Sequence, residues 1–296
     1  MTREVTWKKI GRDISAQTSV DGILKEAGLD YTVHKEGIFL SSGKMIPDRV
    51  ATVKDDGTPI GVVSKAYEVY QNQDAFGFIC DVPDIEFEKA GETHNGMVYI
   101  IGKLPNMTVL QDEFTPYVIF QTSHNGRFNV RATICPLRIV CQNQFAYTFS
   151  HMRNTINIRH SRQLTTRVAQ AQQLIIDTAA YMNGFTNTAE ELSLLKIQDK
   201  DTFLEIVDKF FDSTKEITAR QARAIEEQKH ILIDCYNAED NANFTGTAWG
   251  VVNAFSDFNT HRQRKNTRTA AESQFMSVTF DTDITKLLMA LRSTVG

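Results

Sequence analysis

The sequence predicts an α+β protein in which a sheet-rich amino-terminal half precedes a helical carboxy-terminal half. Up to about residue 160, short apolar runs alternate with Asp-Gly and Asn-Gly turns, which is typical of antiparallel hairpins. After Ser161, apolar residues recur at helical spacing. We expect an N-terminal arm over residues 1–45, a sheet-rich core of ββα type over 46–162, and a helical region over 163–296 that packs on the core or on neighbouring subunits.

Three hairpins are expected, each centred on a turn that contains glycine. The first joins residues 49–54 to residues 59–64 through the turn that ends at Gly57. The second and third turn at Asn95-Gly96 and Asn125-Gly126. A type I′ turn there would place both central residues at positive φ, which Asn and Gly tolerate.

A weak internal repeat accompanies the first and third hairpins. Tyr70-Gln-Asn-Gln-Asp-Ala-Phe-Gly-Phe78 resembles Cys141-Gln-Asn-Gln-Phe-Ala-Tyr-Thr-Phe149. Asn72 and Asn143 stand where a strand pattern gives way to a helical pattern, which is a suitable N-cap position. These features predict two ββα-like units with a third hairpin between them; the alternative is a chance similarity of short Gln/Asn strings.

Apolar positions at helical spacing predict five helices in the second half of the chain. Asn183-Gly184 and Ser213 are the expected breaks. The helices should span residues 164–182, 188–211, 214–236, about 247–258 and 283–291.

One set of apolar residues exceeds what a short helix needs for its own core. It predicts self-association, with packing on the sheet of the same chain as the alternative. The set consists of Phe203, Ile206, Val207, Phe210 and Phe211.

Charge is unevenly distributed along a chain whose formal net charge is −4. Between Glu113 and Asp177 there is no aspartate or glutamate, and the same stretch holds seven arginines and no lysine. Segregated charge focuses the field on one surface, and guanidinium groups contact phosphates bidentately and stack on bases. The predicted DNA-binding residues, with Phe128 and His160 as stacking partners, are Arg127, Phe128, Arg131, Arg138, Arg153, Arg159, His160, Arg162 and Arg167.

Two other interpretations of the basic residues stay open. The arginines could be solvated, or could pair with acidic groups of the helical half. A second basic cluster, His261-Arg-Gln-Arg-Lys-Asn-Thr-Arg268, suits either phosphate binding or a solvated helix end whose cations favour the helix dipole.

Catalytic motifs are weak. His124-Asn125-Gly126 would need a second histidine or carboxylates to hold a metal ion, and the arginine-rich stretch has no carboxylate, so we interpret it as a turn. Neither a phosphate-binding loop nor a dinucleotide fingerprint is present. We therefore expect no catalytic residue, no metal and no cofactor.

One acidic segment superficially resembles the carboxylate-plus-lysine motifs of nucleases. Strand alternation would place Asp84, Glu86 and Glu88 on one exposed polar face, with Lys89 next in the chain. An exposed face explains these residues without catalysis.

The remaining composition indicates a soluble, cytoplasmic protein. No apolar run approaches the roughly 20 residues of a membrane span, and the first residues lack the apolar core of a signal peptide. The four cysteines have no Cys-x-x-Cys spacing, which favours free thiols in a reducing compartment.

Five segments stand out along the chain: residues 61–76, 122–126, 137–144, 158–161 and 246–254. In this order they resemble the phage/plasmid-like proteins of an uncharacterised domain family. The resemblance covers roughly residues 45–292 and implies a phage, prophage or plasmid origin, and hence a bacterial cytoplasm. The order of hairpin, strand and helix is also similar to single-strand annealing proteins of the Rad and Red-beta types.

Together these observations predict an ATP-independent protein that binds single-stranded DNA and anneals complementary strands during phage recombination. We expect a homo-oligomer, with a phage exonuclease as a possible partner. One alternative is a metal-dependent nucleic-acid-processing enzyme that uses Asp84, Glu86, Glu88 and Lys89. The other is a non-enzymatic protein-binding or virion component whose arginines meet an acidic protein surface.

Overall fold

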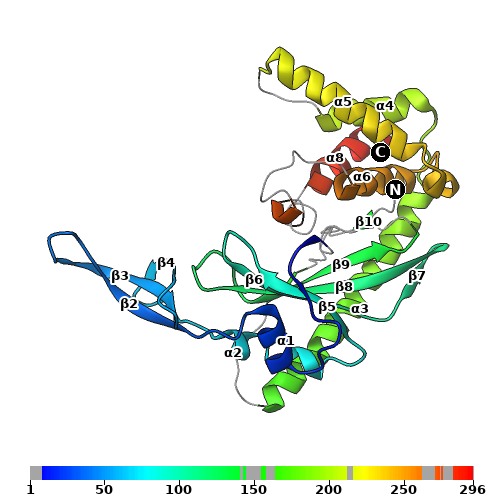
Figure 1. The fold of residues 1–296 in the computed structure, drawn as a ribbon. Coiled ribbons are helices and arrows are strands. Elements are labelled where there is room, and N and C mark those ends of the chain that lie inside the picture. The colour runs from blue at the N-terminus through cyan, green and yellow to red at the C-terminus, as the bar shows by residue number, and fades with distance from the viewer. Residues whose placement is uncertain are drawn as a thin grey trace.

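The computed structural model describes residues 9–140, 143–144, 155–157, 164–211, 216–261, 271–273, 275 and 283–295. It confirms the α+β class, because antiparallel sheets occupy the amino-terminal half and helices most of the carboxy-terminal half (Figure 1).

The main sheet is antiparallel and has the order β1-β5-β6-β8-β9-β10, with β7 beside β8 and β11 beside β9. Hairpins at Gly96 and Gly126 connect β5 to β6 and β8 to β9, as expected. The strands are β1 (Arg12–Asp13), β5 (Glu86–Glu92), β6 (Met97–Lys103), β7 (Met107–Val109), β8 (Asp112–Ser123), β9 (Arg131–Arg138), β10 (Asn143–Gln144) and β11 (Thr155–Asn157).

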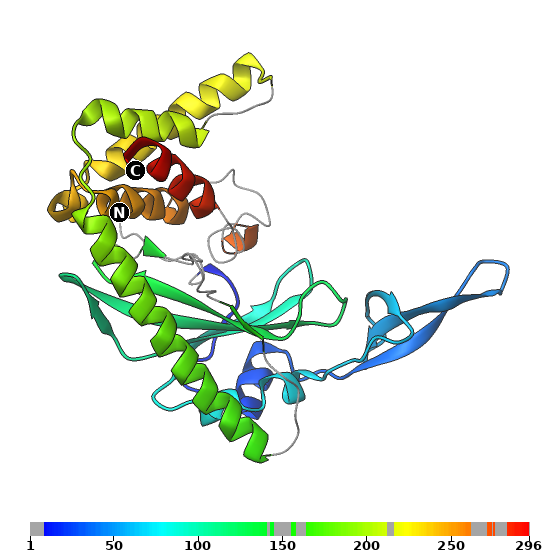
Figure 2. The ribbon, with the colours of Figure 1, turned by 180° about the vertical axis from the view of Figure 1, so that it is seen from behind.

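One long helix, α3 (Leu164–Leu194), crosses one face of this sheet (Figure 2). Its Ala171 and Leu174 join the buried cluster formed by Val118 and Phe120 of β8. The expected break at Asn183-Gly184 is wrong, because the helix continues through it. Met182 and Phe185 on either side are buried, and such packing offsets the roughly 1 kcal/mol that a glycine costs inside a helix.

The other helices form a separate layer around α6 (Ala248–His261), whose Trp249 and Phe255 are buried. Gly250 lies where an added Cβ would meet the carbonyl oxygen of Phe244, so the segment after Gly246 is a close packing contact. The remaining members are α4 (Lys200–Phe211), α5 (Ala219–Tyr236), α8 (Asp283–Val295) and the short 3₁₀ helix η3 (Glu239–Phe244).

The apolar residues of α4 belong to this internal core, so the premise for self-association drawn from them is wrong. Phe211 is half-buried, and the others are buried against the same chain because α4 packs on α5, α6 and α8. The buried residues are Phe203, Ile206, Val207 and Phe210.

A second, three-stranded sheet projects from the body (Figures 1 and 2). It consists of β2 (Val33–Phe39), β3 (Met45–Lys54) and β4 (Pro59–Ser64), and we call residues 33–64 the β-arm. Gly57 has a φ of 85° in the turn between β3 and β4, as the Asp-Gly pattern predicts. The expected boundary at residue 45 falls at the start of β3, so β2 pairs with β3 across it.

Two short helices pack at the base of the β-arm. α1 (Val20–Ala27) has Ser19 as its N-cap and ends at Gly28, whose φ of 69° suits glycine. α2 (Asn72–Phe76) begins after Gln71. Both helices contribute to the same buried cluster as the first half of α3.

The two expected ββα-like units do not correspond to a structural repeat. The first unit, β3–β4–α2, begins in the β-arm, whereas β8 and β9 of the second lie in the main sheet and are followed by strand β10. Asn72 lies inside α2 and Asn143 in β10, so neither caps a helix. Asn72 is used elsewhere, because its amide nitrogen donates to the carbonyl oxygen of Leu29 at 2.8 Å.

The type I′ turns are also not formed. Gly96 and Gly126 have φ of 80° and 73°, but Asn95 and Asn125 are not among the described residues at positive φ. The connection from β8 to β9 is longer than a two-residue turn, since it covers residues 124–130. Asn125 is therefore free to use its side chain for contacts between turns.

Candidate functional site

The structure describes the side chains of four of the nine predicted DNA-binding residues. Arg127 and Phe128 lie in the turn between β8 and β9, and Arg131 and Arg138 lie at the two ends of β9. The backbone of Arg167 lies in α3, but its side chain is outside the described part of the chain. Arg153, Arg159, His160 and Arg162 lie outside the described residues, as do positions 262–268 of the second basic cluster.

Arg127 is exposed and forms no ion pair with another described residue. Its backbone N–H donates to Oδ1 of Asn125 at 3.1 Å. The next residue, Phe128, is half-buried against the cluster on the face of the sheet opposite α3, and its N–H donates to Oγ of Ser123 at 2.9 Å. The turn thus holds an aromatic ring inward and a guanidinium outward.

Arg131 and Arg138 face opposite sides of the sheet. The register between β8 and β9 is unbroken from the pair Phe114–Arg138 to the pair Gln121–Arg131, so Pro136 does not reset the alternation. Arg131 is half-buried on the face opposite α3. With the Gln121 amide oriented so that its oxygen faces Arg131, the guanidinium donates to that oxygen from Nη2 at 3.0 Å. The two arginines therefore do not line one groove.

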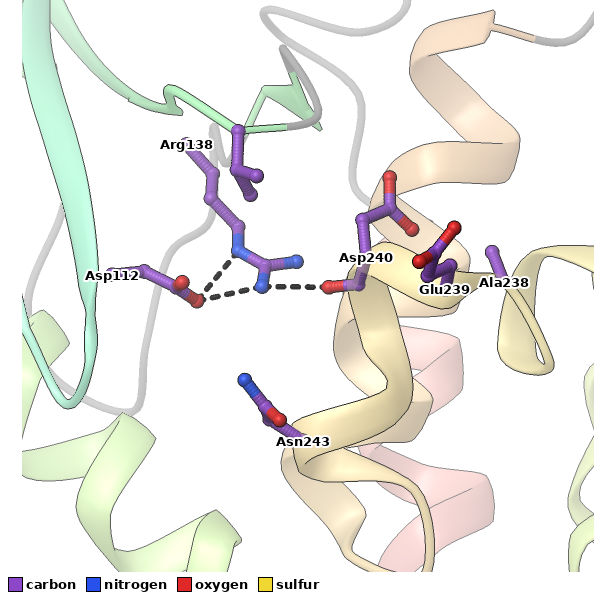
Figure 3. A pocket seen from close by; sticks show the side chains of 7 residues that line it. Asp112, Arg138, Ala238, Glu239, Asp240 and Asn243 are labelled. Atoms are coloured by element: carbon purple, nitrogen blue, oxygen red, sulfur yellow. Dashed lines mark hydrogen bonds and ion pairs between the residues drawn. The ribbon is translucent and has the colours of Figure 1, made fainter.

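Arg138 is 2% exposed, so its guanidinium does not reach a phosphate at the surface, contrary to the prediction (Figure 3). Its Nε and Nη2 both lie 2.7 Å from Oδ2 of Asp112. Nη2 also donates to the carbonyl oxygen of Asp240 at 2.9 Å. Burying a charged guanidinium costs solvation free energy, and a carboxylate that pairs with it offsets this cost. Arg138 is therefore paired within the chain, but the carboxylate belongs to Asp112 of β8 and not to the helical half named in the open alternative; η3 contributes the backbone carbonyl of Asp240.

A cavity of about 520 Å³ lies beside this pair, between the ends of β8 and β9 and the start of η3 (Figure 3). Glu239 and Asp240 line it together with Asp112, so carboxylates outnumber the one arginine. In the described part of the chain, no three His, Cys, Asp or Glu side chains are grouped so that they could hold a metal ion. The charge of this cavity does not suit a phosphate backbone.

Only part of the acidic segment forms the expected face: Glu86 and Glu88 lie beside Lys103 and Tyr117, which pair across β6 and β8, whereas Asp84 precedes the strand. Asp84 has a φ of 55° in the turn before β5, and a register shift follows Phe87. Glu86 pairs with Lys103 at 2.8 Å. The segment's other two charged side chains also have separate partners, because Glu88 accepts from the Tyr117 hydroxyl at 2.9 Å and Lys89 lies 3.7 Å from Asp13.

His124, which the sequence predicts only as a turn residue, is buried and contacts α2 at this end of the sheet. His124 is 1% exposed, and its Nε2 lies 2.9 Å from Oδ1 of Asn72. Burial lowers the pKa of His124 to about 4. Both partners belong to motifs that the sequence analysis identified, Gln71-Asn72 and Ser123-His124-Asn125-Gly126. Nothing in the sequence indicates that these two motifs contact each other in space.

Asn125 ties both hairpin turns to the β-arm. Its Nδ2 donates to the carbonyl oxygen of Asn95 at 2.8 Å. Gly61 of β4 and Gly96 lie so close that a Cβ on either would come within 2.8 Å of the Asn125 side chain. The Tyr67 hydroxyl, just after β4, donates to the carbonyl oxygen of Ser123 at 2.9 Å. The turn that contains Arg127 is therefore held in place by contacts with the Asn95 turn, β4 and Tyr67.

Three of the four cysteines, Cys80, Cys135 and Cys235, are free thiols, as expected. Among the described helices, none combines the length and the hydropathy that crossing a bilayer requires.

Comparison with known proteins gives one match. No curated protein and no solved structure is significantly similar to the chain. The family model described as "Domain of unknown function (DUF932)" matches residues 59–286, which include β4, the whole main sheet apart from β1, and most of the helical layer. Because this match covers more than half of the chain, the protein belongs to the DUF932 family.

Proposed function

We propose that the protein binds single-stranded DNA without ATP and anneals complementary strands. The observation that carries the proposal is the exposed guanidinium of Arg127 on an anchored turn. It pairs with no carboxylate among the residues that the structure describes, and the stretch from 114 to 176 has no carboxylate in its sequence. A cation on an anchored turn, in a stretch of chain that has no acidic residue, is suited to a phosphate backbone.

Annealing fits the chemistry of this region. It requires that the backbone of one strand be held while its bases stay open to a complement, and no covalent bond is made or broken. Arg127 would contact phosphate, and half-buried Phe128 and Arg131 would support the turn from below. A phage or plasmid origin, a homo-oligomeric state and a partner exonuclease belong to the same proposal.

The direct test is titration of labelled single-stranded oligonucleotides at several salt concentrations. The slope of log affinity against log salt should be shallower by about 0.7 in Arg127→Gln, since one phosphate contact is lost. Arg292→Gln, which removes an exposed arginine from α8, should leave the slope unchanged. Equal effects of the two variants would remove Arg127 from the interface. Absence of retained oligonucleotide at low salt would overturn the proposal.

Strand annealing then needs its own measurement. Two complementary oligonucleotides labelled with a fluorescent donor and acceptor should pair faster in the presence of the protein without ATP. RNA oligonucleotides in parallel titrations test the preference for DNA. If the protein binds the oligonucleotides but does not accelerate their pairing, it is a single-strand-binding protein and the annealing part of the proposal is wrong.

One observation favours a second candidate, a protein-binding component. Arg138 shows that an arginine of the acid-free stretch is satisfied by Asp112 and by a backbone carbonyl of the helical layer. An acidic protein surface could engage Arg127 in the same way. Failure of the oligonucleotide titration combined with retention on an acidic partner protein would favour this candidate.

A further inference from the structure

The β-arm ends in apolar side chains that nothing in the described chain covers. Phe39 and Met45 are opposite each other across β2 and β3, and they are 62% and 56% exposed. Leu40, next along the chain, is 51% exposed. Large exposed apolar groups gathered at one point mark an interaction site. We call Phe39, Leu40 and Met45 the arm tip.

A groove of suitable character lies between α4 and α5. Its apolar lining comes from Phe211, Ile217, Ala222 and Ile225, and its volume is about 440 Å³. Ile217 is 44% exposed. Within α5 only Leu232 and Tyr236 are buried, so the first three turns of this helix project from the helical layer (Figure 1). We call this feature the α4–α5 groove.

The arm tip cannot reach the groove of its own chain. The β-arm projects sideways from the main sheet, α5 lies on the far side of the helical layer from that sheet, and the two are well separated in both views (Figures 1 and 2). β3 alone extends about 30 Å at 3.3 Å per residue, and the β-arm leads away from the helical layer. Any contact between the two features must therefore join different molecules.

We propose that the arm tip of one copy docks into the α4–α5 groove of a second copy, head to tail. Phe39 would be the aromatic anchor that fills the pocket, which is the arrangement that dominates binding energy at protein interfaces. Such a heterologous contact uses two different surfaces, so it propagates into a ring or a filament.

Charge supports this choice of partner. Lys44 is the one charged residue from position 37 to 46, so the tip is cationic. At the groove, Asp208 and Glu226 share a single cation, because both carboxylates bind Lys229, at 2.7 and 3.1 Å. Lys209, the other cation of the lining, is paired with Glu205 at 2.8 Å. The four charged residues of the lining sum to zero; counted with Glu205, which pairs with Lys209, the five side chains carry one net negative charge, opposite in sign to Lys44.

The test uses two variants that each lose one half of the contact. The tip variant carries Phe39→Ser and Met45→Ser; the groove variant carries Ile217→Ser and Ala222→Glu. Val62→Ser, at an exposed β-arm position away from the tip, and Ile231→Ser on α5 are matched controls. Circular dichroism verifies that every variant is folded, and light scattering measures the mass at tens of micromolar protein.

Wild type and both controls should exceed the 33.5 kDa of one chain. Each variant alone should be a monomer, and the equimolar mixture should stop at twice that mass, because one intact tip meets one intact groove. A groove variant that still dimerises would indicate tip-to-tip contact and overturn the proposal. So would a monomeric wild type, or assembly in both variants. No nucleic acid is present, so this result is independent of the oligonucleotide titration.

Discussion

His124 donates a hydrogen bond from Nε2 to Oδ1 of Asn72 over 2.9 Å. The direction follows from Asn72, whose Nδ2 is already committed to the carbonyl oxygen of Leu29 at 2.8 Å. The proton of the neutral ring is therefore on Nε2, and Nδ1 is a buried acceptor without a partner among the described residues. The bond joins the β8–β9 turn to α2 and α1, at the base of the β-arm.

Stability should fall as the pH drops from about 6.5 to 4. Burial lowers the pKa of His124 in the folded state to about 4, against 6.5 when exposed. In that window the unfolded state binds the extra proton, so the contribution is complete above pH 6.5 and is lost toward pH 4. The effect is on the order of 3 kcal/mol. Urea unfolding at several pH values should show a steeper dependence in wild type than in His124→Gln. Equal slopes would contradict the neutral, buried ring.

Asn125→Val should destabilise the protein through lost side-chain hydrogen bonds and not through backbone strain, because Asn125 does not have positive φ. It removes the bonds to the carbonyl of Asn95 and the N–H of Arg127, and each bond contributes about 1 kcal/mol. Gly61→Ala should destabilise as well, because its Cβ would lie 2.8 Å from Cβ of Asn125. In a double-mutant cycle, Asn125→Gly should relieve part of the Gly61→Ala cost. Strictly additive effects would show that the two residues are not in contact.

Removal of Arg138 should affect stability and leave DNA binding unchanged. Arg138→Ala leaves the carboxylate of Asp112 without its partner, and breaking a buried ion pair in this way costs about 3–5 kcal/mol. Arg127→Ala, at an exposed position, should change the free energy of unfolding by less than about 0.5 kcal/mol. Denaturant titration distinguishes the two. A mild Arg138→Ala effect together with weaker oligonucleotide binding would return Arg138 to the interface.

The extent of the proposed DNA-binding surface depends on whether Arg159 and Arg162 also contact phosphate. If both contact phosphate, the double variant with alanine at both positions should reduce the salt slope by about 1.4, at 0.7 per contact. The reduction should be the same for every oligonucleotide sequence, because backbone contacts do not read bases. A folded double variant with unchanged affinity and slope would assign these arginines a structural role and leave Arg127 as the sole described contact.

His124→Ala should lower stability while leaving oligonucleotide affinity within a few-fold of wild type. The ring lies 1% exposed beneath the turn, so it does not meet a ligand at the surface. A nuclease assay on the same variant tests the enzymatic alternative. Loss of a measurable cleavage activity with stability intact would assign His124 a catalytic role.

Local patterns predicted much of the fold. The Asp-Gly and Asn-Gly turns predicted three hairpins, and α6 and α8 lie where the apolar spacing predicts helices. Both signals act over a few residues: glycine reaches positive φ at little cost, and helical periodicity marks the face that must be buried. The break at Asn183-Gly184 failed because packing of Met182 and Phe185 outweighs a local preference.

The sequence by itself determined the α+β class, the order of its halves and the concentration of arginine in a stretch without acids. Among the three of those arginines whose side chains the structure describes, the tertiary structure decided which one reaches solvent. Arg127 and Arg138 are alike in sequence, but one lies on a turn and the other beneath η3 beside Asp112. Burial and ion pairing depend on residues up to a hundred positions away in the chain, and the spacing of a motif carries no information about them.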